Sequence, residues 1–246
     1  MVVWKPYPYA WGEGEVLTFD PKTGREIEAR SHDRIEGSLA PDWDCIAERS
    51  GSGKYGSAPY YVYLYERNQG MKVRGRLKGY FYTFSPDGKC IAIWDTDGHT
   101  VPQVYDTVSL SPVLKYSFGD KDLFHMKYSP DGNRLIGLDK DRRFHAWDAS
   151  NGSFLGSSAQ EEDLKCNELL GVSQSGRYVA GYCYSTGRTL VWDIETRQTL
   201  KTCVPPVSDA GGVEFTPDST RMLYLTKGNT MTMMVDLKSG KVLHEF

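Results

Sequence analysis

The chain has 246 residues, a formal net charge of −3 and 39% hydrophobic residues. It contains no run of about 18 apolar residues that could span a membrane, and its first residues lack the basic leader and apolar stretch of a signal peptide. A slightly acidic protein has no general attraction for phosphate backbones, so the composition argues against nucleic acid as a partner.

Cysteine, glycine and aromatic content restrict the class of protein further. The five cysteines are odd in number and widely spaced, which fits a reducing compartment, the cytoplasm, better than a disulfide framework. The 25 glycines and the 13% aromatic residues predict a protein built of strands and turns.

One short phrase recurs five times along the chain. It consists of an apolar residue, a turn of the Ser-Pro-Asp-Gly type and a further apolar run. The copies are LAPDWDCIAE (39–48), FSPDGKCIAI (84–93), YSPDGNRLIG (128–137), VSQSGRYVAG (172–181) and FTPDSTRMLY (215–224). Proline fixes φ and Asp-Gly accepts a positive φ, so each copy predicts a hairpin.

A second phrase alternates with the first at the same period. It is an apolar run that ends in an acid, followed by a turn and another apolar run. The acids are Asp20, Glu66, Asp106, Asp148, Asp193 and Asp236. Each period therefore holds four short strands, a to d: the first phrase joins a to b, a variable loop joins b to c, and the second phrase joins c to d. Four strands every 40–45 residues are typical of a β-propeller blade.

The predicted fold is all-β, a single β-propeller domain over residues 1–246 with about six four-stranded antiparallel blades. In chain order the blade segments are approximately 1–34, 35–79, 80–122, 123–163, 164–209 and 210–246. The first segment supplies strands b, c and d at VVW (2–4), VLTF (16–19) and EIEAR (26–30), but no strand a. An uncovered strand edge is costly. We therefore expect an open or partial ring, a longer parent protein, or a strand supplied by additional chain or by a partner.

Two segments carry a family resemblance. FHAWDASNGSFL (144–155) and LVWDIETRQTL (190–200) resemble the Trp-Asp-ended strands of WD-repeat propellers, and the turns extend the resemblance over nearly the whole chain. The resemblance implies a buried network of a Gly-His histidine, a b–c turn aspartate and the tryptophan. Only Asp141, six residues before Trp147, stands at the expected turn position, so we expect most blades to lack the network. Bacterial propellers with similar turns, including the YVTN type, remain an alternative.

The sequence predicts no catalytic, cofactor-binding or metal site. The five histidines are scattered over different blades, and the recurring turn acids are spaced one blade apart around a ring. The charged exceptions among the mostly apolar a strands are Lys127, Glu168 and Glu214. An alternative is a propeller-type enzyme, such as a YVTN-like lactonase or the accessory propeller of a hydrolase, which would gather such groups at the central channel.

A basic stretch, KVRGRLKG, carries Lys72, Arg74, Arg76 and Lys78 at alternate positions. On a regular strand these four charges lie on one side. We interpret them as protection of an exposed blade edge rather than as a phosphate-binding patch.

The loops between strands b and c differ from blade to blade. Two of them, PYPYAWGEGE (6–15) and RSGSGKYGSAPYY (49–61), are long and rich in aromatic residues. In WD-type propellers the b–c and d–a loops share one face that commonly binds partners, and aromatic and arginine side chains anchor such contacts. The candidate contact residues are Tyr7, Tyr9, Trp11, Tyr55, Tyr60, Arg142, Arg143 and Arg188. The sequence thus predicts a non-catalytic scaffold that binds a protein or peptide.

Overall fold

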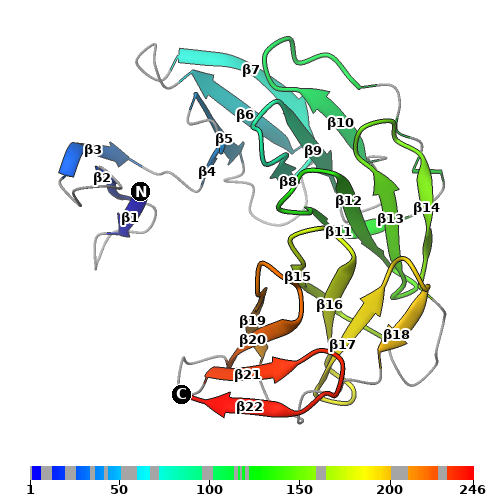
Figure 1. Cartoon of the computed structure of the whole chain (residues 1–246). Helices are drawn as coiled ribbons and strands as arrows, with labels where there is room; N and C mark the ends of the chain where they lie inside the picture. The colour runs from blue at the N-terminus through cyan, green and yellow to red at the C-terminus, as the bar shows by residue number, and fades with distance from the viewer. Residues whose placement is uncertain are drawn as a thin grey trace.

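Six antiparallel sheets follow one another along the chain in the computed structural model (Figure 1). The structure describes residues 2–6, 13–19, 26–33, 37–41, 44–50, 60–66, 72–95, 102–113, 116, 118–119, 122–158, 165–200, 210–226 and 232–246. Every regular element among these residues is a β-strand. The all-β propeller prediction is confirmed.

The sheets keep the order in which their strands occur in the sequence. The first holds β1 (Val2–Pro6), β2 (Glu13–Phe19) and β3 (Glu26–Asp33), and the second β4 (Gly37–Leu39), β5 (Cys45–Ser50), β6 (Tyr61–Glu66) and β7 (Lys72–Lys78). The third holds β8 (Phe81–Phe84), β9 (Cys90–Trp94) and β10 (Gln103–Asp106). The fourth holds β11 (Leu123–Tyr128), β12 (Arg134–Asp139), β13 (Phe144–Asp148) and β14 (Phe154–Ser157).

The last two sheets repeat the four-stranded pattern. The fifth holds β15 (Glu168–Val172), β16 (Tyr178–Cys183), β17 (Arg188–Asp193) and β18 (Gln198–Leu200), and the sixth β19 (Ala210–Phe215), β20 (Arg221–Thr226), β21 (Thr232–Asp236) and β22 (Val242–Glu245). The first blade has three strands, as expected.

The third sheet is narrower than predicted. Its fourth strand is reduced to a single bridge between Tyr105 and Pro112, flanked by a hydrogen bond from the Val113 N–H to the Val104 carbonyl (2.7 Å). Proline has no N–H to donate, so it interrupts a ladder where a regular outer strand would need one.

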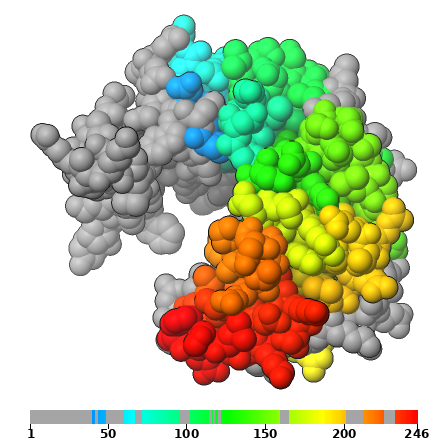
Figure 2. All heavy atoms as spheres, in the orientation of Figure 1, coloured from blue at the N-terminus to red at the C-terminus, as the bar shows by residue number. Residues whose placement is uncertain are grey.

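Four hydrophobic cores join consecutive sheets from the second to the sixth. Each core takes side chains from two neighbouring sheets; one, for example, brings Ile91 and Ile93 of β9 against Val62 and Leu64 of β6. The other three lie between the third and fourth, the fourth and fifth, and the fifth and sixth sheets. The space-filling view shows the third to sixth sheets following one another without a break along one arc (Figure 2).

The recurring turns owe their shape to the polar residues that the sequence analysis singled out. Between β11 and β12, the Ser129 hydroxyl donates a hydrogen bond to Asp131 Oδ1 (2.6 Å), the Asn133 N–H donates to the same oxygen (3.0 Å), and Gly132 takes φ +76°. The β8–β9 and β19–β20 turns repeat this arrangement around Asp87 and Asp218. Asp42 lies outside the described residues.

The basic stretch on β7 does not form a single charged side, contrary to the expectation. The pairing register shifts between Leu64 and Tyr65, which leaves Arg74 as the extra residue of a β-bulge. Lys72 pairs with Glu66, while Arg76 pairs with Tyr63. A bulge reverses the alternation of side chains, so Lys72 and Arg76 lie on opposite faces of the sheet.

Candidate functional site

The b–c connections and the first residues of strands a lie at the same edge of each blade, because strands a and b form an antiparallel hairpin joined at the opposite edge. We call the first edge the loop face and the edge with the a–b and c–d turns the turn face. In the fourth and fifth sheets the loop face carries Phe124, His125, Arg142, Glu168 and Tyr184, which we name the loop-face cluster.

Arg142 is held in a strained tight turn between β12 and β13. Its φ of +69° is a left-handed conformation that is uncommon for a residue with a side chain. Its guanidinium carbon lies 5.1 Å from the centre of the Phe124 ring, within cation–π range. The Phe124 ring in turn meets the His125 ring edge-on, with centroids 4.8 Å apart. Arg142 is therefore placed beside aromatic surface at the start of β11.

Tyr184 follows β16 and is 57% exposed, more than most aromatic side chains in folded proteins. Its hydroxyl donates a hydrogen bond to Glu168 Oε2 (3.1 Å), and its N–H donates to Asn167 Oδ1 (3.1 Å). Its ring stands edge-on to that of Tyr182, 5.2 Å away. These contacts fix an exposed aromatic ring in one orientation, which lowers the entropy cost of using it for binding.

The cluster is electrostatically mixed. Burial lowers the pKa of His125, with the nearby positive charges of Lys127 and Arg142 acting in the same direction and Glu168 opposing them. Burial also lowers the pKa of Lys127, against the opposing effect of Glu214 and Glu168. The Lys127 ammonium donates to the Leu170 carbonyl on the neighbouring a strand (2.8 Å). The charged residues of strands a thus interact with one another across adjacent blades.

The structure separates the predicted contact residues into three groups. Tyr7, Tyr9, Trp11 and Tyr55 lie outside the described residues. Tyr60 is half-buried and packs edge-on against Tyr80, with ring centroids 4.8 Å apart. Arg143 is also half-buried, and its N–H donates to Asp139 Oδ1 (2.9 Å). Arg188 is exposed at the start of β17, and Arg142 belongs to the loop-face cluster.

Tyr184 is not among the contact residues predicted from the sequence, because the loop that carries it is short. Length and aromatic content single out the two long loops, whereas the short loop CYSTGR also places an aromatic residue immediately after strand b. An aromatic residue next to a tight b–c turn is the signal that identifies it.

A buried polar pair in the fourth sheet corrects the expectation for Asp141. The network aspartate is Asp139, which is 7% exposed and lies 2.7 Å from His145 Nε2, whereas Asp141 is exposed. His145 lies on β13 itself, two residues before Trp147, so no Gly-His pair is needed to supply the imidazole. In the described residues the buried Nε1 atoms of Trp147 and Trp192 make no hydrogen bond, so the pair does not include the tryptophan.

The third strands supply the observation that decides the family. β13 and β17 end in Trp147-Asp148 and Trp192-Asp193, with both tryptophans buried in the cores between blades. The acid then accepts hydrogen bonds from the following turn, as Asp148 does from the Ser150 N–H (2.8 Å) and Asp193 from the Glu195 N–H (3.0 Å). The chain has the fold and the strand ends of a WD-repeat-type β-propeller.

Curated relatives of this WD-repeat chain come from two fungi. It is 28% identical over 123 residues to eukaryotic translation initiation factor 3 subunit I of Pyricularia oryzae, and 28% identical over 124 residues to the subunit of that name of Aspergillus oryzae. The matches cover 48% of this chain and 33% and 34% of the relatives, so the chain matches about a third of the length of these relatives. No protein-family model matches the chain.

Two hollows open on the turn face of the WD-repeat arc. One, of about 650 Å³, lies between the third and fourth sheets, and the other, of about 580 Å³, lies between the fifth and sixth. Across the described ranges, no group of three or more His, Cys, Asp or Glu side chains is arranged to hold a metal ion. In the same part of the chain, no helix has the length and hydrophobicity needed to cross a membrane.

Proposed function

We propose that the chain is a non-catalytic scaffold of the cytoplasm that binds a protein or peptide partner through its loop face. The observation that carries the proposal is the loop-face cluster, where exposed Tyr184 is held by Glu168 and Arg142 lies over Phe124. Tyrosine and arginine are, with tryptophan, the residues enriched among the side chains that anchor protein–protein contacts. Because both are already oriented by neighbouring groups, little side-chain freedom is lost on binding.

The relatives support the same class of function. Both are named as a subunit of a eukaryotic translation initiation factor, which is a name for one part of a larger assembly. A propeller chain related to such a subunit would contribute a rigid surface rather than bond chemistry. We propose partners of this type, that is, other protein subunits.

A strand from a partner or from additional chain is a second contact that we propose. β1 pairs with β2 along one edge, and among the described strands none pairs along its other edge. An added strand there would satisfy the backbone N–H and C=O groups of β1 and complete a four-stranded blade.

An affinity experiment with matched variants tests the loop face. Arg142→Ala/Tyr184→Ala removes both oriented anchors, and Val108→Ala is the control because Val108 is 73% exposed in a c–d turn on the opposite face. We expect the double variant to lose partners that the wild type and Val108→Ala both retain, as identified by mass spectrometry. Retention of every partner by a folded double variant would refute the loop face as the contact surface.

A further inference from the structure

The a–b turns provide an internal comparison, because the same position in successive repeats carries different residues. The first residue of strand b is Cys90 in the third sheet, Arg134 in the fourth, Tyr178 in the fifth and Arg221 in the sixth. Strands a, b and c are arranged in the same order in all four sheets, so these side chains occupy equivalent places, which in the third to fifth sheets lie next to the following blade. Comparing the boundaries between neighbouring blades therefore shows which side chain fills this space at each boundary.

Arg134 crosses the boundary between the fourth and fifth sheets. Its Nη1 lies 3.5 Å from the Gly176 carbonyl and its Nη2 lies 3.6 Å from Glu195 Oε1, both in turns of the fifth sheet. The chain's own guanidinium therefore occupies the turn-face position between these two blades.

Cys90 is too short to make the same crossing between the third and fourth sheets. The hollow of about 650 Å³ opens there, and its walls include Gly132 and Ser150, the equivalents of Gly176 and Glu195 in the fourth sheet. The hollow thus corresponds to the space that an arginine fills one blade further along.

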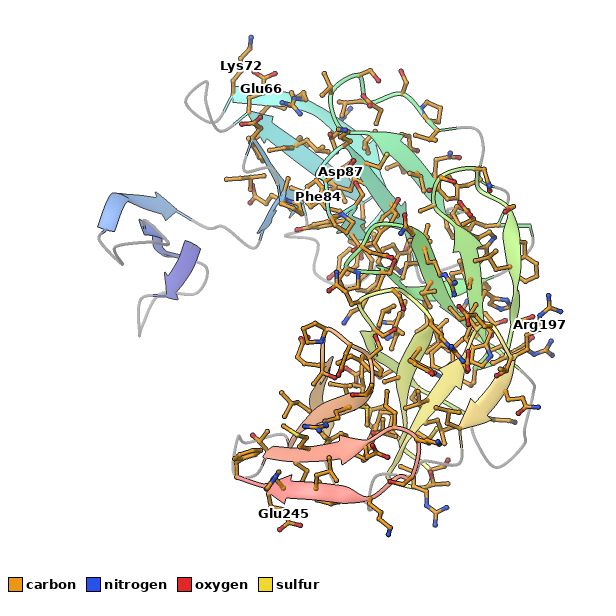
Figure 3. All side chains as sticks on the ribbon, viewed as in Figure 1. Glu66, Lys72, Phe84, Asp87, Arg197 and Glu245 are labelled. Atoms are coloured by element: carbon orange, nitrogen blue, oxygen red, sulfur yellow. The ribbon has the colours of Figure 1, made fainter. Side chains whose placement is uncertain are left out.

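The charges around this hollow favour a cation. Its charged lining residues are Asp87, Asp106, Asp131 and Lys89, three carboxylates against one ammonium, and Lys89 is exposed with its Nζ 3.7 Å from Asp87 Oδ2. Burial raises the pKa of Asp87 and of Asp131, but hydrogen bonds from the turn outweigh it and hold both below the ordinary value. Hydrogen bonds from Ser109 lower the pKa of Asp106 as well. All three carboxylates are ionised at neutral pH. Figure 3 labels Asp87 in the turn that joins β8 to β9.

A buried hydroxyl at the hollow offers a further acceptor for an entering cation. Tyr128 is only 9% exposed and lines the hollow, and its hydroxyl interacts with the side chain of Tyr116 without reaching full hydrogen-bond geometry. Burial raises the pKa of Tyr128, so the hydroxyl stays neutral and can accept a hydrogen bond. A guanidinium N–H entering the hollow would donate one and so complete the hydrogen bonding of this buried group.

The hollow between the fifth and sixth sheets differs because a guanidinium of the chain itself lies at its edge. Its equivalent position is Tyr178, and the guanidinium of Arg177 lies over that ring (5.0 Å) while donating to Asp193 Oδ2 (2.8 Å). The chain supplies its own guanidinium at this hollow, whereas no arginine is among the described residues that line the first one.

We propose that the turn-face hollow between the third and fourth sheets binds an arginine side chain of a protein or peptide partner. The proposal rests on the scaffold function and adds a contact on the face opposite to the loop-face cluster. The guanidinium would take the place that Arg134 fills between the next two blades, close to the carboxylates and to the Tyr128 hydroxyl.

A capped tripeptide, acetyl-Gly-Arg-Gly-amide, tests the proposal with the whole chain by calorimetry. We expect saturable binding to the wild type, unchanged binding to Cys90→Ser, and a loss of roughly tenfold or more in affinity for Cys90→Arg, whose own side chain would occupy the hollow. The citrulline peptide, which has the same shape without the charge, should bind far more weakly. Free L-arginine should also bind more weakly, because the three carboxylates repel its carboxylate.

Mapping by NMR keeps the test decisive even if Cys90→Arg fails to fold. In the wild type the arginine peptide should shift the amide signals of Gly132 and Ser150 and leave those of Gly176 and Glu195 unchanged. Absence of saturable binding, equal shifts at both pairs, tighter binding of free arginine or citrulline peptide, or full binding to a folded Cys90→Arg variant would each overturn the proposal. None of these results depends on the loop-face variants, so the proposed scaffold function is tested by a separate experiment.

Discussion

Replacing Asp139 with alanine is expected to destabilise the protein strongly, whereas replacing Asp141, two residues later, is expected to have almost no effect. Asp139 is 7% exposed and accepts hydrogen bonds from the Arg143 N–H (2.9 Å) and at His145 Nε2 (2.7 Å). Removal of one member of a buried, hydrogen-bonded pair typically costs about 3–5 kcal/mol. A substitution at an exposed position such as Asp141 usually changes stability by about 0.5 kcal/mol or less.

Urea denaturation followed by tryptophan fluorescence measures this difference, because Trp147 is buried two residues from His145 on β13. Isosteric Asp139→Asn separates charge from shape: it keeps an acceptor for the Arg143 N–H but removes the negative charge facing His145. We expect it to lie between the wild type and Asp139→Ala. Equal stabilities for Asp139→Ala and Asp141→Ala would refute the assignment of the buried pair.

The pH dependence of stability gives the same prediction an independent check. Burial raises the pKa of Asp139, but the hydrogen bonds from His145 and Arg143 outweigh it and leave the pKa below the ordinary value. An aspartate with a lowered native pKa stabilises the fold above its unfolded pKa of about 4, and this contribution is lost as the pH falls through the native value. The Asp139→Ala variant should therefore lose less stability than the wild type on acidification below about pH 4.

Two further predictions concern packing and turn chemistry. Gly171→Ala on β15 should destabilise the fold by about 1–3 kcal/mol, because the added Cβ would lie 2.6 Å from the Val213 carbonyl oxygen of β19. The control is Gln174→Ala at an exposed position. A urea midpoint for Gly171→Ala equal to that of the control would contradict the prediction. Hydrogen bonds from Thr216 and Thr220 lower the pKa of Asp218 to about 2. In Thr216→Val, an NMR titration should place that pKa closer to the ordinary aspartate value, and an unchanged value would show that the Thr216 hydroxyl is not the main cause.

Features encoded by neighbouring residues were predictable from the sequence. The turn phrases fix strand boundaries by local chemistry, as Asp131 shows by accepting hydrogen bonds from Ser129 and Asn133 within five residues. The recurrence of these turns was enough to give the blade count and the incomplete first blade.

Features that depend on register between strands were not predictable. Asp139 meets His145 because β12 and β13 pair Leu138 with Phe144, and no single-sequence pattern distinguishes that pairing from one that would bring Asp141 inward. The bulge at Arg74 likewise arises where β7 pairs with β6, and it moves Lys72 to the other face. In the candidate site, Arg142 was found by residue type, whereas Tyr184 depends on hydrogen bonds to Asn167 and Glu168 from a neighbouring strand.

The sharing of each hydrophobic core by two sheets makes the blades thermodynamically dependent on their neighbours. Val191 of β17, for example, is buried in the core that also holds Met222 and Tyr224 of β20, so a cavity at this position would weaken two blades at once. On β14, by contrast, Phe154 is 49% exposed and its ring contacts those of His145 and Trp147 in the same blade, so a change at Phe154 would act first on one blade. Over evolutionary time, exposed residues of the outer strands should therefore vary more than the buried residues in the cores shared by two blades.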